Sequence, residues 1–409
     1  MGETSTGRNP ADPTRRRLLK RGAVVAGGIA VAAAGGLVWR AAAEDVFSPF
    51  DGPAYAPWSD WRTAPLPGPL ALVQHAILAA SPHNTQPWRF RVQDGRIEVY
   101  AERARNLGAF DPFRREMRIG LGCSVENIAL AAPALGYAAT VEPVEGSLPG
   151  RPDAAIERVA TISLAPAPAT GDDGELYRAI AQRHTDRGPY DPSRGVPAGF
   201  LQAARRFVEA QGVRLDLFEA GGQRQTFDRL MIDATRAIVE DGEMEADSQH
   251  WFRKGPRAIA RHRDGLTLDA VGLPPAMTVL AKLLPAMDAE TAHRYWERQT
   301  REVHLASARM TGLLSLPDRY DGAGNLRAGR VWQHLHLLAV THGLAVQPMN
   351  QPVEVADRQR QRGLPASIDA RFAALLDTPG WQPTFAFRIG HPTRPALPSP
   401  RRAAQDCLA

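Results

Sequence analysis

The sequence predicts an α+β protein in which two similar halves follow one another in a single chain. Hydrophobic patterns with helical spacing alternate with patterns typical of strands from about residue 69 onward. In addition, an apolar helix, a glycine and a strand occur in this order twice, at 119–144 and at 328–354. The glycines of both copies are 14 residues apart, as Gly122 and Gly136 and again as Gly329 and Gly343. This repeat favours a duplicated half-domain over two unrelated units.

In the first half, a helix at about 69–80 with one apolar face precedes a hairpin that turns at Gln93-Asp94-Gly95. A long apolar helix follows, and Gly136 is expected to end it before the next strand. The alternating residues 157–166 predict the last strand of this half. The stretch 165–175 is small, proline-dotted and acidic, which is typical of a linker. We therefore predict a first half at 44–165 and a second half at 166–409.

The second half begins with predicted helices at 175–182 and 197–212, and "VRLDLFE" after them has the pattern of a strand. Residues 222–320 look dominated by helices, with an interruption at 253–277. The second copy of the helix, glycine and strand unit comes next, and "PTFAFRIG" at 383–390 predicts the last strand. The order of helix and strand thus follows that of the first half.

The positive charge of the chain belongs to its N-terminus. Of a formal net charge of +5, residues 1–43 account for all, because the rest contains equal numbers of basic and acidic residues. This distribution gives no support to a nucleic-acid partner. "TRRRLLKRG" at 14–22, the uncharged run 22–39 and the small residues Ala41 and Ala43 have the order of an export signal.

"TRRRLLK" resembles the twin-arginine signal, with Arg15 and Arg16 as the pair. This resemblance implies a signal at 1–43, a partner in the twin-arginine export machinery and an exported, periplasmic or otherwise extracytoplasmic protein. Cleavage after Ala43 and retention as a membrane anchor through residues 22–39 are both open, because 18 uncharged residues almost suffice to span a bilayer.

The two cysteines favour no redox or metal site. Cys123 lies in an apolar helix pattern and Cys407 in the last three residues, so two buried thiols are favoured over a disulfide. His334 and His336 are two residues apart on a predicted helix and point to different sides. Metal catalysis is therefore not expected.

Four polar stretches are candidates for a site. "SPHNTQPWRF" at 81–90 has Asn84, Thr85 and Gln86 before Pro87-Trp88, and three such residues help neither a helix nor a strand. We expect the Pro-Trp pair to anchor this turn in the core. The other stretches are "RHTDR" with donors on alternate residues, "PMNQP" after an apolar strand, and "SPRR" in the tail. Taken singly, they also fit a helix stop, surface ion pairs, a turn and a basic tail.

Together and in this order, the stretches resemble the nitroreductase superfamily of FMN proteins, most closely its Acg-like branch of internally duplicated single chains. The resemblance spans about 66–409 and implies a nitroreductase-like fold that forms a pseudo-dimer within one chain. It also implies three groups of FMN-binding residues: a turn that approaches the ring, a strip that binds the phosphate and pyrimidine edge, and a turn on the flavin N5 side whose backbone N–H groups are free. In that order they are Ser81, Pro82, His83 and Asn84; Arg183, His184, Thr185 and Arg187; and Met349, Asn350 and Gln351. Arg401 or Arg402 would complete the phosphate site.

The resemblance implies an FMN-dependent oxidoreductase that transfers hydride or electrons through flavin N5 to a small nitro-aromatic or quinone-like acceptor. The reductant would be NAD(P)H or another donor, and no residue is expected to act as a catalytic acid or base. Arg187 would replace the lysine of many relatives, since this chain has only Lys20, Lys254 and Lys282.

Each half holds only part of the implied site, so we expect one FMN per chain and no need for a homodimer. Residues 245–280, hereafter the lid segment, lie where relatives carry a variable helical excursion over the site. This segment could form a substrate pocket or a closed lid. A closed lid would make the protein a flavin-binding or sequestering protein with little turnover.

Overall fold

The computed structural model describes residues 36, 38–47, 49–171, 174–285, 287–376 and 378–409. The twin-arginine pattern and most of the uncharged run after it lie outside these residues. Among the described residues, no helix is both long and apolar enough to cross a membrane.

The first half contains a four-stranded antiparallel sheet of order β1-β2-β4-β3. Its hairpin turns at Asp94-Gly95, as the sequence predicts, with Gly95 at φ 68°. Trp88 at the start of β1 is completely buried, which confirms that it anchors the preceding turn. In chain order the main elements are α3 Leu70–Ala76, β1 Trp88–Gln93, β2 Arg96–Glu102, α4 Arg115–Ala131, β3 Tyr137–Pro143 and β4 Ile156–Pro166.

The second half repeats this arrangement. Its antiparallel sheet has the order β6-β7-β9-β8, and the short strand β5 (Tyr190–Asp191) also pairs with β9. The main elements are α6 Ala198–Ala210, β6 Arg214–Phe218, β7 Met310–Leu316, α12 Gly322–Thr341, β8 Ala345–Pro348 and β9 Gln382–Pro392. The α+β class is confirmed, and the same order of elements and of strand pairing occurs twice. The division of the chain between residues 165 and 166 remains a prediction.

The strand β7 corrects the expectation that residues 222–320 are dominated by helices to their end. All seven residues of β7 are buried, so its sequence, "MTGLLSL", shows no alternation between apolar and polar positions. A fully buried strand cannot be told from a buried helix by its hydrophobic pattern alone.

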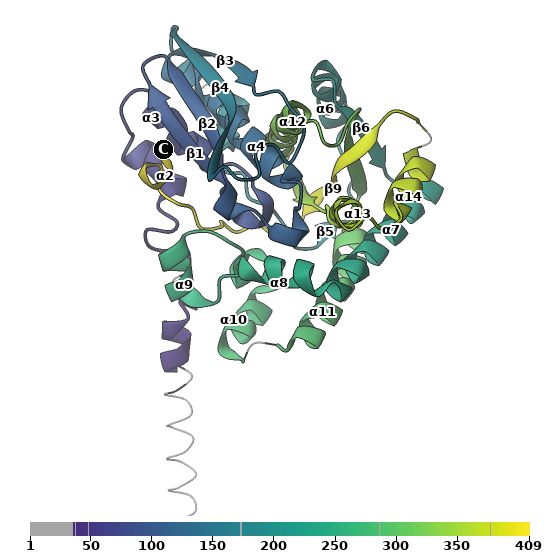
Figure 1. The fold of residues 1–409 in the computed structure, drawn as a ribbon. Helices are drawn as coiled ribbons and strands as arrows, with labels where there is room; N and C mark the ends of the chain where they lie inside the picture. Colours follow the sequence, from purple (N-terminus) through teal and green to yellow (C-terminus); the bar gives the residue numbers. More distant parts are fainter. Residues whose placement is uncertain (1–35, 37, 48, 172–173, 286, 377) are drawn as a thin grey trace, which may run out of the picture.

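The remaining helices surround the two sheets. Figure 1 shows α8 to α11 gathered at one end of the molecule, while α7, α13 and α14 lie against the second half. Their bounds are α2 Pro57–Thr63, α5 Glu175–Ala179, α7 Gly221–Glu240, α8 Gly242–His250, α9 Gly255–His262, α10 Pro275–Leu283, α11 Ala289–Arg298, α13 Gln351–Gln361 and α14 Ser367–Leu376.

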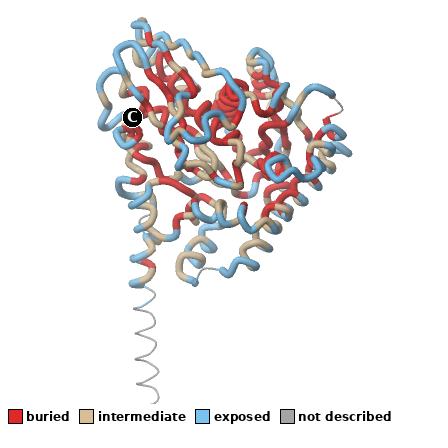
Figure 2. The backbone as a smooth tube through the Cα atoms, in the orientation of Figure 1, coloured by how far each residue is buried: buried red, intermediate tan, exposed pale blue. Residues whose placement is uncertain are grey.

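The two long helices α4 and α12 cross at the centre, where the buried backbone is concentrated (Figures 1 and 2). A Cβ atom on Gly122 would lie 2.0 Å from the carbonyl oxygen of Leu326, and one on Gly329 would lie 2.0 Å from that of Ile119. The contacts are reciprocal across the crossing. The first glycine of each repeated pair is therefore required because the two helix backbones touch.

The second glycine of each pair follows the helical segment in a left-handed conformation, at φ 82° for Gly136 and 66° for Gly343. This is the helix-ending role that the sequence predicts. Cys123 and Cys407 are both buried and free, so the expectation of two separate thiols is confirmed.

Candidate functional site

Residues 81–86, hereafter the polar turn, connect α3 to β1 through a strained backbone. His83, Asn84 and Gln86 have φ of 44°, 56° and 51°, a left-handed region that residues other than glycine enter at a cost of about 1–3 kcal/mol each. The backbone N–H of Gln86 donates to Ser81 Oγ at 3.1 Å, and the backbone N–H of Thr85 donates to the carbonyl of Pro82 at 2.9 Å. These local bonds close the turn.

Two distant segments hold the polar turn in place. Asn84 Nδ2 donates to the carbonyls of Gly265 at 3.1 Å and Pro400 at 2.9 Å, while the Arg401 guanidinium donates to Asn84 Oδ1. Gln86 Nε2 donates to the Arg263 carbonyl at 2.8 Å. The first half, the lid segment and the C-terminal tail therefore meet at Asn84 and Gln86.

The structure brings seven of the predicted site residues together around one pocket. Its cavity volume is about 20 Å³. The predicted residues that line it are Ser81, Asn84, Arg183, His184, Thr185, Arg187 and Arg401, and the others are Trp58, Ala80 and Ser399. Ser81 and Asn84 come from the first half, and the remaining predicted residues come from the second.

Three arginines of this pocket lack an acidic partner. No carboxylate of the described residues lies within 4.0 Å of the guanidinium nitrogens of Arg183, Arg187 or Arg401. Arg183 and Arg401 are 2% exposed, so water solvates neither guanidinium to any large extent. Burying unpaired charge is costly, because a charge leaves water without a compensating opposite charge. An anion in the pocket would supply the opposite charge that these arginines lack.

The pKa values of the pocket residues are lowered, as the cost of burying positive charge predicts. Burial lowers the pKa of Arg183 to about 10, with a further contribution from Arg187. Burial and then the charge of Arg183 lower the pKa of Arg401 well below its usual range. The neighbouring His184 has its pKa lowered to about 3, first by burial and then by Arg183 and Arg401, so it is neutral at pH 7.

Several buried donors at the pocket also lack partners within the described chain. Arg183 Nε, Arg401 Nε and His184 Nδ1 are buried and form no hydrogen bond. Arg183 Nη2 donates to the Leu78 carbonyl at 3.2 Å and Nη1 lies 3.5 Å from His336 Nδ1, so Nε is the group without a partner. Buried polar groups normally have a partner, so unpaired nitrogens on two adjacent cations indicate a ligand with several acceptor oxygens.

Trp58 is a pocket residue that the sequence reasoning missed. Arg401 lies over its ring at 4.7 Å from the centroid, and the ring of His184 meets it edge-on at 4.4 Å. Trp58 Nε1 donates to the Ser399 carbonyl at 2.8 Å, which holds the tail against α2. The aromatic residues of the lead-in "PWSDW" were the available signal, since tryptophan is the preferred ring for an arginine.

Pro82 and His83 belong to the polar turn but do not line the pocket. His83 Nε2 lies 2.9 Å from Ser248 Oγ on α8, and its ring meets Phe110 edge-on. Burial, assisted by the charge of Arg187, lowers the pKa of His83 to about 4. His83 thus connects the polar turn to the lid segment.

Met349, Asn350 and Gln351 do not line the pocket either. The Met349 amide donates to the Ala386 carbonyl at 2.7 Å, and Asn350 Oδ1 accepts from the Ala386 amide at 2.8 Å. These groups extend the pairing with β9, so the Met349 N–H is not free, whereas the free N–H groups are expected at Asn350 and Gln351. All three residues are buried near the start of α13.

The tail places Arg401 rather than Arg402 at the pocket. The Arg402 amide donates to Gln86 Oε1 at 2.9 Å, and its guanidinium donates to the Asp406 carbonyl at 2.7 Å and to Glu102 at 3.4 Å. Arg402 therefore holds the polar turn through Gln86 and does not line the pocket.

The lid segment covers Arg187 and the polar turn. Arg187 Nη1 donates to the Ala270 carbonyl at 3.0 Å, and Gly272 lies so close that a Cβ there would be 2.3 Å from the Arg187 backbone. Asp264 pairs with Arg105 at 2.8 Å, which ties the same segment to the first half. Contacts with both halves thus hold the lid segment beside the pocket residues Asn84 and Arg187.

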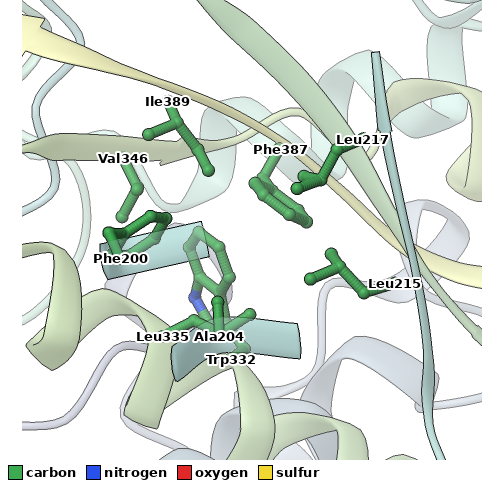
Figure 3. Close-up of a pocket in the computed structure, with 9 residues that line it drawn as sticks. All are labelled: Phe200, Ala204, Leu215, Leu217, Trp332, Leu335, Val346, Phe387 and Ile389. Carbon is green, nitrogen blue, oxygen red and sulfur yellow. The ribbon is translucent and has the colours of Figure 1, made fainter. Parts of the chain in front are cut away.

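A second hollow is apolar throughout. It lies between α6, α12 and the second sheet, where Phe200, Trp332 and Phe387 face one another (Figure 3). It has no charged or amide side chain that would orient a polar ligand. The site is therefore the arginine pocket.

No family model matches the chain. A relative from Mycobacterium tuberculosis with the name "Putative NAD(P)H nitroreductase" is 27% identical over 339 residues, which cover 80% of this chain and 87% of the relative. Another from that organism, named "Putative NAD(P)H nitroreductase acg", is 34% identical over 148 residues, 36% of this chain and 42% of the relative.

Two solved structures show weaker similarity. An FMN-dependent nitroreductase from Mycobacterium smegmatis, solved in complex with NADPH, is 15% identical with a TM-score of 0.36. A nitroreductase with bound FMN from Desulfitobacterium hafniense is 14% identical with a TM-score of 0.34. Both matches cover 57% of this chain and 96% of the other. The sequence similarity thus extends over most of the chain, whereas the two structural matches have TM-scores of 0.36 and 0.34 and cover 57% of it.

Proposed function

We propose that this protein is an FMN-dependent oxidoreductase of the nitroreductase type, with one FMN bound in the arginine pocket. The observation that carries the proposal is the set of three arginines, Arg183, Arg187 and Arg401, beside the polar turn without a carboxylate partner. An organic phosphate supplies the missing negative charge, and its oxygens accept from the unpaired nitrogens.

The residues present fit FMN. Arg183, Thr185 and Arg401 would hold the phosphate, and Arg187 would lie at the pyrimidine edge of the ring. Ser81 and Asn84 would face the ring from the other half. FMN supplies the electron transfer, and the chain's groups bind it, orient it and stabilise negative charge on it. The lid segment over Arg187 would keep water away from the ring.

The names of the relatives support NAD(P)H as the reductant and a nitro compound as the acceptor. We include small nitro-aromatic and quinone-like compounds in the proposal. The division of labour between the halves supports one FMN per chain in a monomer, because the turn and the arginines each occur once. We further propose that residues 1–43 direct export by the twin-arginine route. Replacing Arg15 and Arg16 by lysine should then abolish export, whereas Arg8→Lys should leave it intact.

The spectrum and stoichiometry of the bound flavin test the main proposal. Purified protein should be yellow, with one FMN per chain. Arg183→Met should weaken FMN binding by about tenfold or more, since it removes a buried phosphate contact. Arg206→Met on the exposed face of α6 is the matched control. A colourless protein that FMN does not reconstitute would refute the proposal, and unchanged binding in Arg183→Met would refute the phosphate site.

Arg183→Met also separates a ligand site from a structural one. Without FMN, the variant should be at least as stable as the parent chain, because methionine removes an uncompensated buried charge. A large loss of stability in the FMN-free protein would instead mean that Arg183 supports the fold.

A second function is favoured by the bonds of the lid segment to Asn84, Gln86 and Arg187. A lid segment with hydrogen bonds to all three residues would suit a protein that binds flavin and excludes substrates. Rapid mixing of the yellow protein with NADPH and a nitro-aromatic separates the two functions. Flavin bleaching followed by reoxidation identifies the oxidoreductase, and a persistent oxidised spectrum identifies the sequestering protein.

A further inference from the structure

One end of the molecule carries a group of exposed apolar side chains, hereafter the α10 face. Its most exposed members are Trp39 at 73%, Phe47 at 70% and Val38 at 62%. The complete set is Val38, Trp39, Phe47, Met277, Val279, Leu280, Leu284 and Met287. These residues come from two parts of the chain, the first described residues at 38–47 and the region around α10.

Contacts hold these two parts together. Arg40 Nη2 donates to the Leu284 carbonyl at 3.4 Å, which places the N-terminal helical residues beside the end of α10. On the other side, Glu44 Oε2 lies 3.1 Å from the position of a Cβ on Gly255 in α9. Figure 1 shows the N-terminal helical segment, α9 and α10 at the same end of the molecule.

The side chains that α10 exposes are apolar, whereas a helix that faces water normally exposes polar side chains. None of its nine residues is buried, and Figure 2 shows no buried backbone along it. The only charged side chain in α10 is Lys282, which is 11% exposed and pairs with Asp269 at 2.9 Å. The charge is turned inward and the apolar residues are turned outward. A contiguous exposed surface of this kind marks a binding surface.

Two further features identify what covers the α10 face. The uncharged run at 22–39 ends at Val38 and Trp39, which belong to this face, and a cluster of arginines and one lysine precedes the run. On α9 and just before it, Arg257, Arg261 and Lys254 are exposed and have no acidic partner among the described residues. An apolar surface with aromatic residues and exposed cations on α9 matches an anionic lipid surface, while the exposed acids Asp45, Asp288 and Glu290 flank it in the sequence.

We propose that the α10 face docks on a lipid bilayer, with α10 and Trp39 in the apolar part of the interface and the cations of α9 at the headgroups. The lid segment then rests between the bilayer and the pocket, because Ala270 and Gly272 contact Arg187. This docking is independent of the cofactor, and it adds a contact surface to whatever anchoring residues 22–39 provide.

A fluorescent label on the full chain tests the proposal. Cys123 and Cys407 are buried, so a polarity-sensitive dye attached to Leu280→Cys reports one position. The matched control is Gln202→Cys, exposed on α6 at the other end of the molecule (Figure 1). Vesicles of phosphatidylcholine with phosphatidylglycerol should raise the fluorescence at position 280 by about twofold or more and shift it to the blue, while the label at 202 stays unchanged.

Three outcomes would overturn the proposal. If the protein sediments with vesicles but the label at 280 does not respond, residues 22–39 anchor it without the α10 face. If the label responds to protein concentration without vesicles, a second copy of the chain covers the face. If neither vesicles nor concentration matters, the face has no lipid or self partner.

Charge variants provide a second measure. Leu280→Glu together with Leu284→Glu should weaken vesicle binding by about tenfold or more, because two carboxylates would enter the apolar interface. Leu364→Glu, at a leucine that is 49% exposed outside the α10 face, should leave vesicle binding unchanged. The FMN content should be the same in all three proteins. Equal vesicle binding by the double variant and the parent chain would refute the docking.

Discussion

The two halves connect corresponding elements in different ways. In the second half, α6 reaches β6 through Gln211, Gly212 and Val213, with Gly212 at φ 63° and simple backbone turn bonds. In the first half, the polar turn makes the same connection with three left-handed residues that are not glycine. Its side chains bind the lid segment and the tail. A connection can evidently be made without strain, so the strain in the first half marks the site rather than the fold.

The sheet and the long central helix occur in both halves, whereas the residues of the pocket do not. Both sheets have the same strand order, and the central glycines meet reciprocally. The polar turn and the unpaired arginines each occur in one half only. Changes at the helix crossing should therefore disturb both halves, and the two connections should differ in how much a substitution costs.

The largest effect is expected at the crossing of α4 and α12. Gly329→Ala places a Cβ 2.0 Å from the Ile119 carbonyl oxygen, and two packed helix backbones cannot move apart without loss elsewhere. The free energy of unfolding should fall by about 3 kcal/mol or more. Gly199→Ala on α6 is the control, because nothing lies within 4 Å of that position. Urea unfolding measures both, and equal stabilities would show that the crossing is not close.

A smaller effect is expected at Asn84. Asn84→Ala loses the bonds to Gly265, Pro400 and Arg401 and leaves alanine at φ 56°. It should lower the free energy of unfolding by about 2 kcal/mol and weaken FMN binding. Gln211→Ala in the corresponding connection should change stability by about 0.5 kcal/mol or less. Similar losses in the two variants would remove the distinction between the connections.

The next effect depends on pH, and only the first connection contains the group responsible. Because the pKa of His83 is lowered from 6.5 to about 4, the unfolded chain binds the proton first as the pH falls. His83 should lower stability between pH 6.5 and 4, by at most about 1.4 kcal/mol per pH unit, and leave it unaffected above this window. His83→Asn should flatten this part of the pH profile of urea unfolding. An unchanged slope would show that His83 is not buried from water.

The smallest effect on the cofactor is expected at Arg402. Arg402→Gln should change FMN affinity by about twofold or less, because its bonds go to Gln86, Glu102 and the Asp406 carbonyl. Arg401→Gln should weaken FMN binding by about tenfold or more, because its guanidinium lines the pocket. Titration of the FMN-free proteins measures both affinities. The reverse order would move the phosphate to the other side of the tail.

Local patterns predicted most of the fold because they report local physics. The glycines that end the helices and the hairpin at Gly95 follow from backbone conformations that few residues adopt. β7 could not be predicted in this way, because its burial on both faces removes the alternation. The roles of Arg401 and Arg402 could not be separated either, because tertiary contacts of the tail decide which guanidinium enters the pocket.

The site was predictable in part for a similar reason. The polar turn and the arginine strip stood out as residues with no local purpose, and seven predicted residues do meet at the pocket. Trp58 was missed because its role depends on Arg401, which is more than 300 residues away in the chain. The position of the Met349 amide depends on pairing with β9, which no local pattern shows.

The touching glycines of α4 and α12 have a consequence for how the protein behaves at low concentration. Where a site is shared between two separate subunits, dilution separates them and the site disappears. Here the two contributors are parts of one polypeptide, and their mutual concentration is set by the connecting chain rather than by the amount of protein. The pocket should therefore stay intact at any dilution, and activity per mole of chain should not depend on protein concentration.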